Sequence, residues 1–277
     1  MKRHPKSPKN AIETGLEDST KQEYKTLRDF VKLLSFYNSF DVSEAGVNEV
    51  AKAVGMAPSK VSRMLRGLTE ESFFEKNELT DKYRVGIGFF EIGLVYIFNS
   101  PLRNIMSPHI EQMARETGFS SSWAIAHKSK IIVMGRVQNL NIDLMTYRVG
   151  FNLSIHTTSL GKLLAAYLPE ERQNDLLKSS ELKKITEKSI VDVGKLKDHL
   201  NMIKERGYST DEGETHEDLF CISAPVKDGS GNVIAGICLM DDRSTSTKTS
   251  PKKILEHIDY IKEKGLFISR QLGYLRI

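Results

Sequence analysis

The stretch VNEVAKAVGMAPSKVSRMLRGL, residues 47–68, decides the fold of the N-terminal part of the chain. Apolar residues recur at helical spacing in two runs, Val47, Val50, Ala51 and Val54 and then Val61, Met64, Leu65 and Leu68. Gly55 stands where a helix C-cap needs a left-handed residue, and Pro58 and Ser59 are typical of a new helix start. The pattern therefore predicts two short helices joined by a tight turn.

The outer face of the second predicted helix is basic and free of acids. Its residues are Ser59, Lys60, Ser62, Arg63 and Arg66. This arrangement predicts a helix-turn-helix whose second helix enters the major groove, where the first four would contact bases and phosphates and Arg66 the backbone. Helical hairpins with solvated basic faces are also common, so the helix pair alone leaves this function open.

The residues that follow, TEESFFEKNELTDKYRVG (69–86), predict a hairpin. A strand begins at Phe73, a turn covers Asn77 to Asp81, and a second strand covers Lys82 to Val85. A hairpin directly after a recognition helix is typical of a wing, and Lys82 and Arg84 would then reach a phosphate or a minor groove. The alternative is an ordinary core hairpin with solvated lysines.

The N-terminal flank predicts one more helix. Leu27, Phe30, Val31 and Leu34 have helical spacing over residues 24–36, so this helix can cover the helix-turn-helix and complete a three-helix core. Residues 1–20 are polar and lysine-rich, and we expect a disordered tail there.

Length and composition bound the remaining possibilities. The chain has 277 residues, enough for two domains, and a formal net charge of only +4, so its basic character is local. Two cysteines exclude a disulfide framework, and their spacing indicates no zinc site. Neither a signal peptide nor a membrane span is evident, so we expect a protein of the reducing cytoplasm without a metal or cofactor.

The segment IGFFEIGLVYIF (87–98) is apolar almost all round. A helix of this kind must be buried, and between two domains the natural partner is a second copy of the chain. The alternative is burial inside one domain. We expect a DNA-binding domain over 21–88, a linker helix at a dimer interface over 89–101, and a second domain over 102–277.

The second domain reads as mixed α and β. We expect helices over 102–117, 158–168, 193–206 and 251–272, the 158–168 helix being amphipathic, and strands over 122–127, 131–137, 143–149, 221–226 and 233–240. The turn DGSG (228–231) is a strong hairpin signal. Hairpin strands with helices at both ends predict an α+β fold with an antiparallel sheet that can enclose a small ligand.

Both halves together resemble the IclR family of bacterial transcriptional regulators. The resemblance rests on NEVAKAVGMAPSKVSRMLRGL, KYRVG and FFEIG in the first half, and on HTTSLGKLLAAYLP, RGYSTDEGE and CISAPVKDGSGNVIAGICL in the second. It implies a winged helix-turn-helix, a linker helix and a GAF/PAS-like effector domain. It also implies a homodimer or homotetramer on operator DNA, controlled by an organic acid, an aromatic acid or a sugar derivative.

The resemblance also places the effector pocket. The matching positions are Leu153, Ser159, Leu160, Asp211, Cys221, Cys238 and Met240. The family often has small hydroxyl residues at positions 238 and 240, a glycine at position 218 and a glycine in the wing turn, whereas this chain has Cys238, Met240, Asp218 and NELTD. Met240 and Leu160 favour an effector that is larger or more apolar than a two-carbon acid.

Two other classes of function stay open. His156, Ser159, Asp211, His216 and Cys221 are residue types of a nucleophile–base set, although none has a recognisable catalytic context. The upstream glycine of a phosphate loop is missing before GKLL, and HEDL lacks a second zinc ligand. Cys221 and Cys238, on neighbouring predicted strands, could instead serve a redox- or metal-sensing regulator, although paired buried cysteines are more often small hydrophobes.

Overall fold

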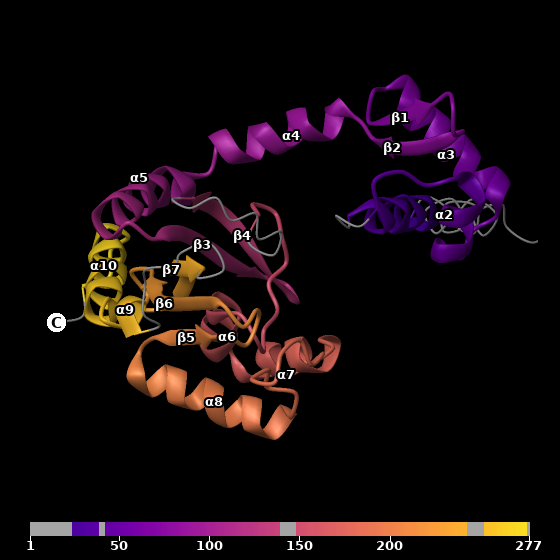
Figure 1. Ribbon diagram of the computed structural model, residues 1–277. Helices are drawn as coiled ribbons and strands as arrows, with labels where there is room; N and C mark the ends of the chain where they lie inside the picture. The colour runs from indigo at the N-terminus through magenta and orange to yellow at the C-terminus, as the bar shows by residue number, and fades with distance from the viewer. Residues whose placement is uncertain (1–23, 39–41, 139–147, 243–251, 276–277) are drawn as a thin grey trace, which may run out of the picture. The chain divides into compact units, whose positions relative to one another are not determined.

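The computed structural model describes residues 24–38, 42–138, 148–242 and 252–275 (Figure 1). The chain divides into two compact units, Met1–Asn99 and Ser100–Ile277, and each has its own core. The tail predicted over residues 1–20 lies outside the described residues. So does most of the strand predicted over 143–149, and residues 148–150 at its end form a bend and turn.

The N-terminal unit is a winged helix-turn-helix. Its elements are a helix over residues 24–37, α2 (Val47–Val54), α3 (Pro58–Glu70), β1 (Phe74–Asn77), β2 (Lys82–Val85) and α4 (Ile87–Phe98). Gly55 ends α2 with φ at 67°, and its N–H bonds to the Ala51 carbonyl, as the sequence predicts. Val50, Val61 and Leu65 are fully buried together with Phe74 of the hairpin. The helix-turn-helix and the wing are confirmed.

The first helix packs through a different face from the one we predicted. Leu33 and Tyr37 are buried, with Leu34 packed beside them, whereas Leu27 and Val31 are 60% and 59% exposed. The helix has apolar residues on more than one side, and contact with Ala45 and the hairpin selects the Leu33–Tyr37 side. Spacing alone could not make that choice, because both stripes repeat at i, i+3 or i, i+4.

The wing turn is built without glycine. Asp81 has φ at 56°, a left-handed conformation that aspartate tolerates better than most residues. The Asn77 carbonyl accepts from the Asp81 N–H at 2.8 Å, and the Asn77 side chain accepts from the Leu79 N–H at 3.0 Å. Lys76 pairs with the Asp81 carboxylate at 2.7 Å. These contacts replace the conformational freedom that a glycine would have supplied.

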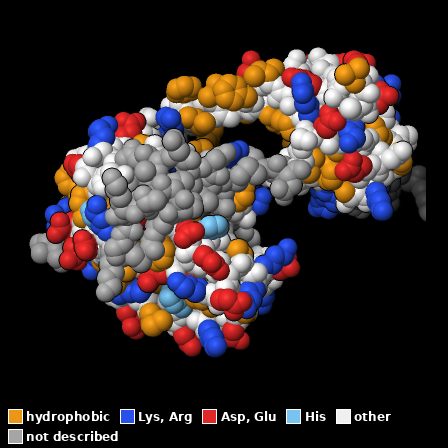
Figure 2. Space-filling model, in the orientation of Figure 1, with side chains coloured by type: hydrophobic (Ala, Val, Ile, Leu, Met, Phe, Trp, Pro, Cys, Tyr) orange, Lys and Arg blue, Asp and Glu red, His pale blue; other side chains and the backbone are white. Residues whose placement is uncertain are grey.

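Helix α4 leaves most of its apolar surface uncovered within the described chain. Gly88 is its only buried residue, whereas Phe90, Val95 and Phe98 are 60%, 62% and 68% exposed. Hydrophobic side chains accordingly gather on the surface over α4 (Figure 2). Within the described residues, the structure does not show burial of this helix inside one domain, the alternative left open by the sequence.

The C-terminal unit is a five-stranded antiparallel sheet between two layers of helices (Figure 1). The strands are β3 (Ser120–His127), β4 (Lys130–Val137), β5 (Ser209–Glu212), β6 (Leu219–Lys227) and β7 (Val233–Asp242), in the order β4-β3-β7-β6-β5. One face packs against α6 (Ser159–Ala166), which is in turn covered by α7 (Glu170–Ser179) and α8 (Val193–Arg206). The other packs against α5 (Pro101–Thr117), α9 (Lys252–Leu255) and α10 (Ile258–Gln271). The antiparallel α+β fold is confirmed, and the finer likeness to GAF and PAS domains stays a prediction.

Three details of the C-terminal unit differ from the prediction. The helix expected over 251–272 is interrupted, because α9 ends at Leu255 and α10 begins at Ile258. Helix α7 and strand β5 were not predicted. Helix α6 is not amphipathic, since all eight of its residues are buried, Lys162 included.

Candidate nucleic-acid interface and ligand site

The reading face of α3 lies opposite its buried face. Val61 and Leu65 are fully buried, whereas Ser59, Arg63 and Arg66 are exposed at i, i+4 and i+7 and therefore share one side of the helix. Ser62 lies beside them and is half-buried. Within the described residues neither arginine is held in an ion pair. Both guanidinium groups are therefore available to phosphates and to guanine edges.

Two of the predicted DNA contacts already have protein partners. Lys60 forms an ion pair with Asp29 of the helix over 24–37, and its hydrogen bond holds the pKa of Asp29 below the usual value. Arg84 donates from Nε and Nη2 to Glu75 Oε2, at 2.9 and 2.7 Å, across the hairpin. The Arg84 pair is half-exposed, so exchanging Glu75 for a phosphate costs little. Lys60 instead links α3 to the helix over 24–37.

Lys82 pairs with Asn77 next to the turn of the wing. It is half-buried, and the pKa of the neighbouring Glu44 is lowered by a hydrogen bond from Asn77 and more weakly by the charge of Lys82. Each cation of the wing therefore has an acid nearby, since Lys82 lies beside Glu44, Arg84 pairs with Glu75 and Lys76 pairs with Asp81. The tip itself carries Leu79, which is 97% exposed.

In the C-terminal unit, four strands place two rows of side chains, small and polar except for Met240, on the sheet face that meets α6. Residues directly opposite one another on antiparallel strands point to the same face. Strand register gives the rows Ser120–Met240–Cys221–Asp211 and Ser122–Cys238–Ser223–Ser209. The second row carries a hydroxyl or thiol on all four strands. We call these eight residues the polar rows.

Helix α6 lies against the polar rows through its first turn. Thr158 caps the helix by accepting from the Gly161 N–H at 3.0 Å. Ser159 Oγ lies 2.7 Å from Ser223 Oγ and 3.5 Å from Cys238 Sγ. Leu160 turns to a different part of the sheet, since a Cβ on Gly236 would lie only 2.8 Å from Leu160 Cδ2. Gly236 thus allows α6 to approach the sheet closely.

The seven predicted effector residues lie in one region. All are buried, and Leu153, Leu160, Cys221, Cys238 and Met240 belong to a single apolar cluster. Ser159 and Asp211 join that cluster through the contacts with Ser223 and Cys238 and through the pairing of Asp211 with Cys221. The structure therefore brings the whole set together.

Asp211 stands at the end of a polar row with one oxygen unused. Its Oδ1 accepts from the N–H groups of Glu214 and Thr215, at 2.8 and 3.3 Å, and this fixes the turn after β5. Its Oδ2 is buried and makes no hydrogen bond of standard geometry within the described residues. Burial raises the pKa of Asp211. In the same described region the hydroxyls of Ser122 and Ser209 also make no hydrogen bond of standard geometry, although Ser122 lies beside the Cys238 thiol.

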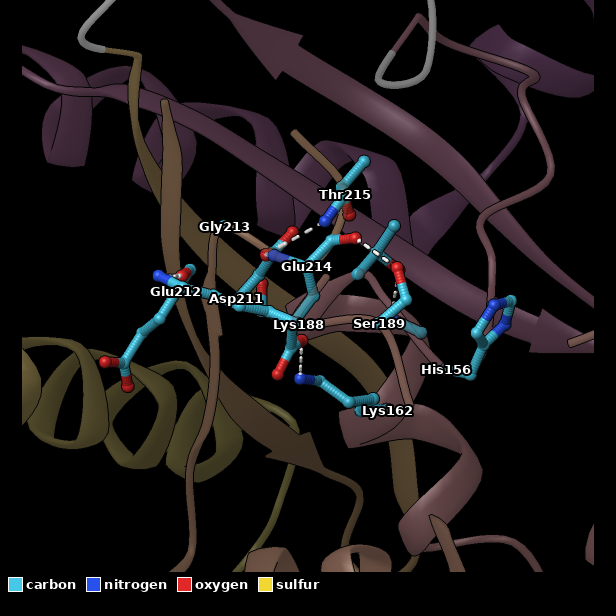
Figure 3. A network of polar contacts seen from close by, with 12 residues as sticks. His156, Lys162, Lys188, Ser189, Asp211, Glu212, Gly213, Glu214 and Thr215 are labelled. Atoms are coloured by element: carbon cyan, nitrogen blue, oxygen red, sulfur yellow. Dashed lines mark hydrogen bonds and ion pairs between the residues drawn. The ribbon is translucent and has the colours of Figure 1, made fainter. Parts of the chain in front are cut away.

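A buried ion pair lies next to Asp211. Lys162 of α6 is fully buried and binds the Glu214 carboxylate, whose side chain is 13% exposed (Figure 3). Burial raises the pKa of Glu214 to about 7, although the Lys162 charge acts in the opposite direction. An ammonium and two carboxyl groups thus share a region with little water.

Two of the side chains considered for catalysis, Ser159 and His156, make structural hydrogen bonds. Ser159 is bonded to Ser223. His156 Nδ1 lies 2.8 Å from Ser154 Oγ, and its Nε2 lies 2.8 Å from the Lys183 carbonyl. Burial lowers the pKa of His156. These contacts describe a histidine that holds two loops together rather than a base beside a nucleophile.

The two cysteines are not joined in a disulfide, and both are fully buried in the polar rows. Cys221 lies opposite Met240 and Cys238 lies opposite Ser223, so the cysteines are diagonal neighbours. Their packing in the main apolar cluster is typical of small hydrophobes. Within the described residues, no three His, Cys, Asp or Glu side chains are grouped as metal ligands.

A cavity of about 340 Å³ reaches one of the predicted effector residues. Its lining includes Leu153, Ile155 and His156 on one side and Glu181, Lys183 and Ile185 on the other. It lies in the C-terminal unit and is the candidate approach to the buried region.

Sequence reasoning missed several polar residues around the candidate site. Ser122, Ser209 and Ser223 could have been found from strand alternation, because they stand two residues from predicted or predictable positions. Lys162 and Glu214 carried no such signal, since a lysine in a helix is normally exposed.

Known proteins resemble both units. Residues 42–78 match the IclR helix-turn-helix domain, and residues 95–244 match the C-terminal domain described as bacterial transcriptional regulator IclR C-terminal. The HTH-type transcriptional regulator XynR of Escherichia coli is 23% identical over 244 residues, 88% of this chain and 95% of XynR.

Solved structures agree with these sequence matches. The Thermotoga maritima IclR structure has a TM-score of 0.64 and 26% identity and covers 91% of this chain and 100% of that one. An IclR homologue from Microbacterium hydrocarbonoxydans, complexed with 4-hydroxybenzoate, has a TM-score of 0.71 and 18% identity, with 89% and 98% covered. No helix in the described part of this chain has the length and apolarity needed to span a bilayer.

Proposed function

The chain belongs to the IclR family of bacterial transcriptional regulators, and we propose how its two units divide that work. It is a DNA-binding regulator of the IclR type with a C-terminal effector-binding domain, and such regulators are not enzymes. The proposal concerns the residues that contact DNA, the chemistry of the effector and the pairing of subunits. We expect the protein to act in the cytoplasm, beside its operator.

We propose that α3 reads the major groove through Ser59, Ser62 and Arg63, while Arg66 holds the DNA backbone. The observation that carries this proposal is the exposed face of α3, opposite Val61 and Leu65. On the wing, Lys82 and Arg84 would contact phosphates, Arg84 after leaving Glu75. Lys60 would contribute in two ways. Its ion pair with Asp29 would hold α3 against the helix over 24–37, and its charge would add to the positive potential that attracts DNA.

The test is operator binding by Arg63→Ala. Loss of a bidentate contact to a guanine should weaken binding by about 1–3 kcal/mol and relax specificity at one base pair. Arg66→Ala should instead weaken binding to all sequences and reduce the salt slope by about one. Fluorescence anisotropy on operator and scrambled DNA measures both effects.

Arg115→Ala is the matched control, because Arg115 is exposed on α5 in the other unit and, within the described residues, its ion pair is with Glu111. It removes the same charge and should leave DNA binding unchanged. Operator affinity that is equal in Arg63→Ala and Arg115→Ala would show that α3 is not the reader.

We propose that the effector lies against the polar rows, between the first turn of α6 and β5. Three groups there make no hydrogen bond of standard geometry within the described residues, namely the hydroxyls of Ser122 and Ser209 and the second oxygen of Asp211. The expectation of a more apolar effector rests partly on Leu160. This side chain packs on Gly236 and not between the first turn of α6 and β5. We therefore expect a hydroxylated organic acid, either aromatic or sugar-derived.

Calorimetry with pairs of acids that differ by one hydroxyl tests this chemistry, for example 4-hydroxybenzoate against benzoate, and a sugar acid against its deoxy form. The hydroxylated member of the matching pair should bind at least roughly tenfold more tightly, because its absence leaves buried polar groups unpaired. Asp211→Asn should reduce that preference. Equal binding of both members in every pair that binds would contradict the proposal.

A homodimer is the assembly we propose, formed in part by α4. The exposed apolar residues of α4, and those of the helix over 24–37, provide the surface for it. A dimer also suits operator reading, since one helix-turn-helix covers too few base pairs for useful specificity. A homotetramer, formed through additional contacts, is compatible with the same surface.

A further inference from the structure

We propose that residues 183–189 form a lid over the effector site and that a ligand reaches the polar rows when this lid opens. The inference rests on the proposed effector site and adds a route of access to it. The lid is the segment KKITEKS between α7 and α8. Its contacts link the two walls of the region that holds the candidate site.

The first wall is the turn after β5, which carries Asp211. Thr186 Oγ1 donates to the Gly213 carbonyl at 2.8 Å, and Ser189 Oγ donates to the Glu214 carbonyl at 3.0 Å. Lys188 Nζ donates to the Glu212 carbonyl at 2.7 Å. Figure 3 shows Lys188 and Ser189 beside this turn, with the Glu214–Lys162 pair next to them. The lid therefore holds the segment whose side chains reach Asp211 and Lys162.

The second wall is the loop that leads into α6. His156 Nε2 lies 2.8 Å from the Lys183 carbonyl, and a carbonyl can only accept, so Nε2 carries the hydrogen. Ser154 Oγ then donates to His156 Nδ1 at 2.8 Å. That direction belongs to the neutral imidazole, which burial favours by lowering the pKa of His156. His156 fastens the start of the lid to the loop that positions Thr158 and Ser159.

The lid is attached by polar contacts in its middle and by apolar contacts only outside its ends. Leu182 and Ile190 pack against the main core on either side of it. Between them Ile185 is 53% exposed, and the Lys184–Glu187 pair lies on the exposed surface. Hydrogen bonds that water can replace are individually weak, so the middle can open while its ends stay packed.

Space is already present beneath this segment. The cavity of about 340 Å³ has Lys183 and Ile185 of the lid on one side, and Leu153, Ile155 and His156 on the other. Leu153 belongs both to this cavity and to the apolar cluster that holds Cys221, Cys238 and Met240. Opening the lid would therefore extend the cavity toward the polar rows.

The chain contains its own reporter for this opening. Its two cysteines, Cys221 and Cys238, are both fully buried in the polar rows. In the native full-length protein, the rate at which Ellman's reagent labels these thiols measures how often the region becomes accessible. The experiment needs no effector, so failure of the lid and failure of the proposed effector site give different results.

We expect the double variant Thr186→Val and Ser189→Ala to be labelled roughly tenfold faster or more, with the urea unfolding midpoint nearly unchanged. Lys184→Ala is the matched control, since Lys184 is in the same segment and pairs outward with Glu187. It should be labelled at the rate of the unaltered protein. Labelling of the double variant at that same rate would overturn the lid, and so would an acceleration fully accounted for by lost global stability.

Hydrogen exchange of the unaltered protein provides a second test that needs no variant. Peptides covering residues 183–189 should exchange faster than those of α6 and α8, which flank the same core. Equal protection of the three segments would show that the lid opens only with the whole unit, and would overturn the proposal. If the lid exchanged faster but calorimetry showed no binding of any acid, the lid would be supported and the proposed effector site would be contradicted.

Discussion

Glu214 and Lys162 place opposite charges where little water can reach them. Lys162 is fully buried and Glu214 nearly so. Desolvation disfavours the ionised carboxylate more than the Lys162 charge favours it, and the pKa of Glu214 rises to about 7 from its ordinary value of 4.5. The folded protein therefore holds this proton more tightly than the unfolded chain does.

This pKa gives the pair a definite effect on stability. Where the folded state binds more protons than the unfolded state, the free energy of unfolding falls as pH rises. The contribution of Glu214 is therefore greatest below about pH 4.5 and is lost by about pH 7. Glu214→Gln cannot ionise, so between pH 4.5 and 8 it should gain stability relative to the unaltered protein by up to roughly 3 kcal/mol.

Urea unfolding of both proteins at several pH values measures this difference. Groups that titrate in the same way in both proteins cancel in this difference. His199 is one of them. Burial lowers its pKa to about 4, so its contribution to stability grows as pH rises from about 4 to 6.5. Glu212→Gln, at the exposed end of β5, should stay close to the unaltered protein, because the charge of Glu212 is the smallest cause of the raised pKa of Glu214. A Glu214→Gln difference that moves in the opposite direction would mean that Lys162 dominates and that Glu214 titrates below its ordinary range.

For single residues, the sequence could locate much of the candidate effector site but not the buried charges of Lys162 and Glu214. Family resemblance placed Ser159, Asp211, Cys221, Cys238 and Met240 in one region, and the structure brings them together. Strand alternation could have added Ser209 and Ser223, because register fixes which residues share a face. Lys162 could not be predicted as buried, since only the packing of α6 between the sheet and α8 removes its exposed side.

Among the elements, those with regular patterns and clear end signals were predictable. Helix α8 runs from Val193 to Arg206 with Gly207 as its cap, and the hairpin β6–β7 turns at DGSG, as expected. Strand β5 reads STDE and lacks apolar alternation, although three of its four residues are buried. Helix α7 was missed because Pro169 looked like an end, whereas it also precedes a helix with two acids in its first turn.

Helix α4 is apolar in sequence, yet most of its surface is exposed in the structure. Its apolar sequence predicts burial, but nothing in the described chain covers it. Ile92, Val95 and Tyr96 stand at i, i+3 and i+4 and are 58%, 62% and 59% exposed, so they form one apolar face. An apolar face of this kind is typical of an interaction surface, and a second copy of the chain is the occupant we propose.

At the scale of the whole molecule, pairing of subunits should decide whether α3 can find its operator. Val95→Lys puts a charge in the middle of the exposed face of α4 without altering the reading helix. A buried unpaired lysine is costly, so the dimer should dissociate at least tenfold more readily in sedimentation experiments. Leu79→Lys, at the exposed tip of the wing, is the control for this measurement and should leave the mass unchanged.

DNA binding should follow the change in mass. A dimer binds its second half-site as an intramolecular event, which raises affinity by about 10²–10⁴ over a single half-site. On an operator with two half-sites, selected from random DNA by the unaltered protein, Val95→Lys should therefore lose most of this gain. On a single half-site it should bind as the unaltered protein does, because Ser59, Arg63 and Arg66 are intact. If Val95→Lys were monomeric yet bound the full operator with unaltered affinity, α4 would have no part in operator recognition, and the effector would have to act through another element.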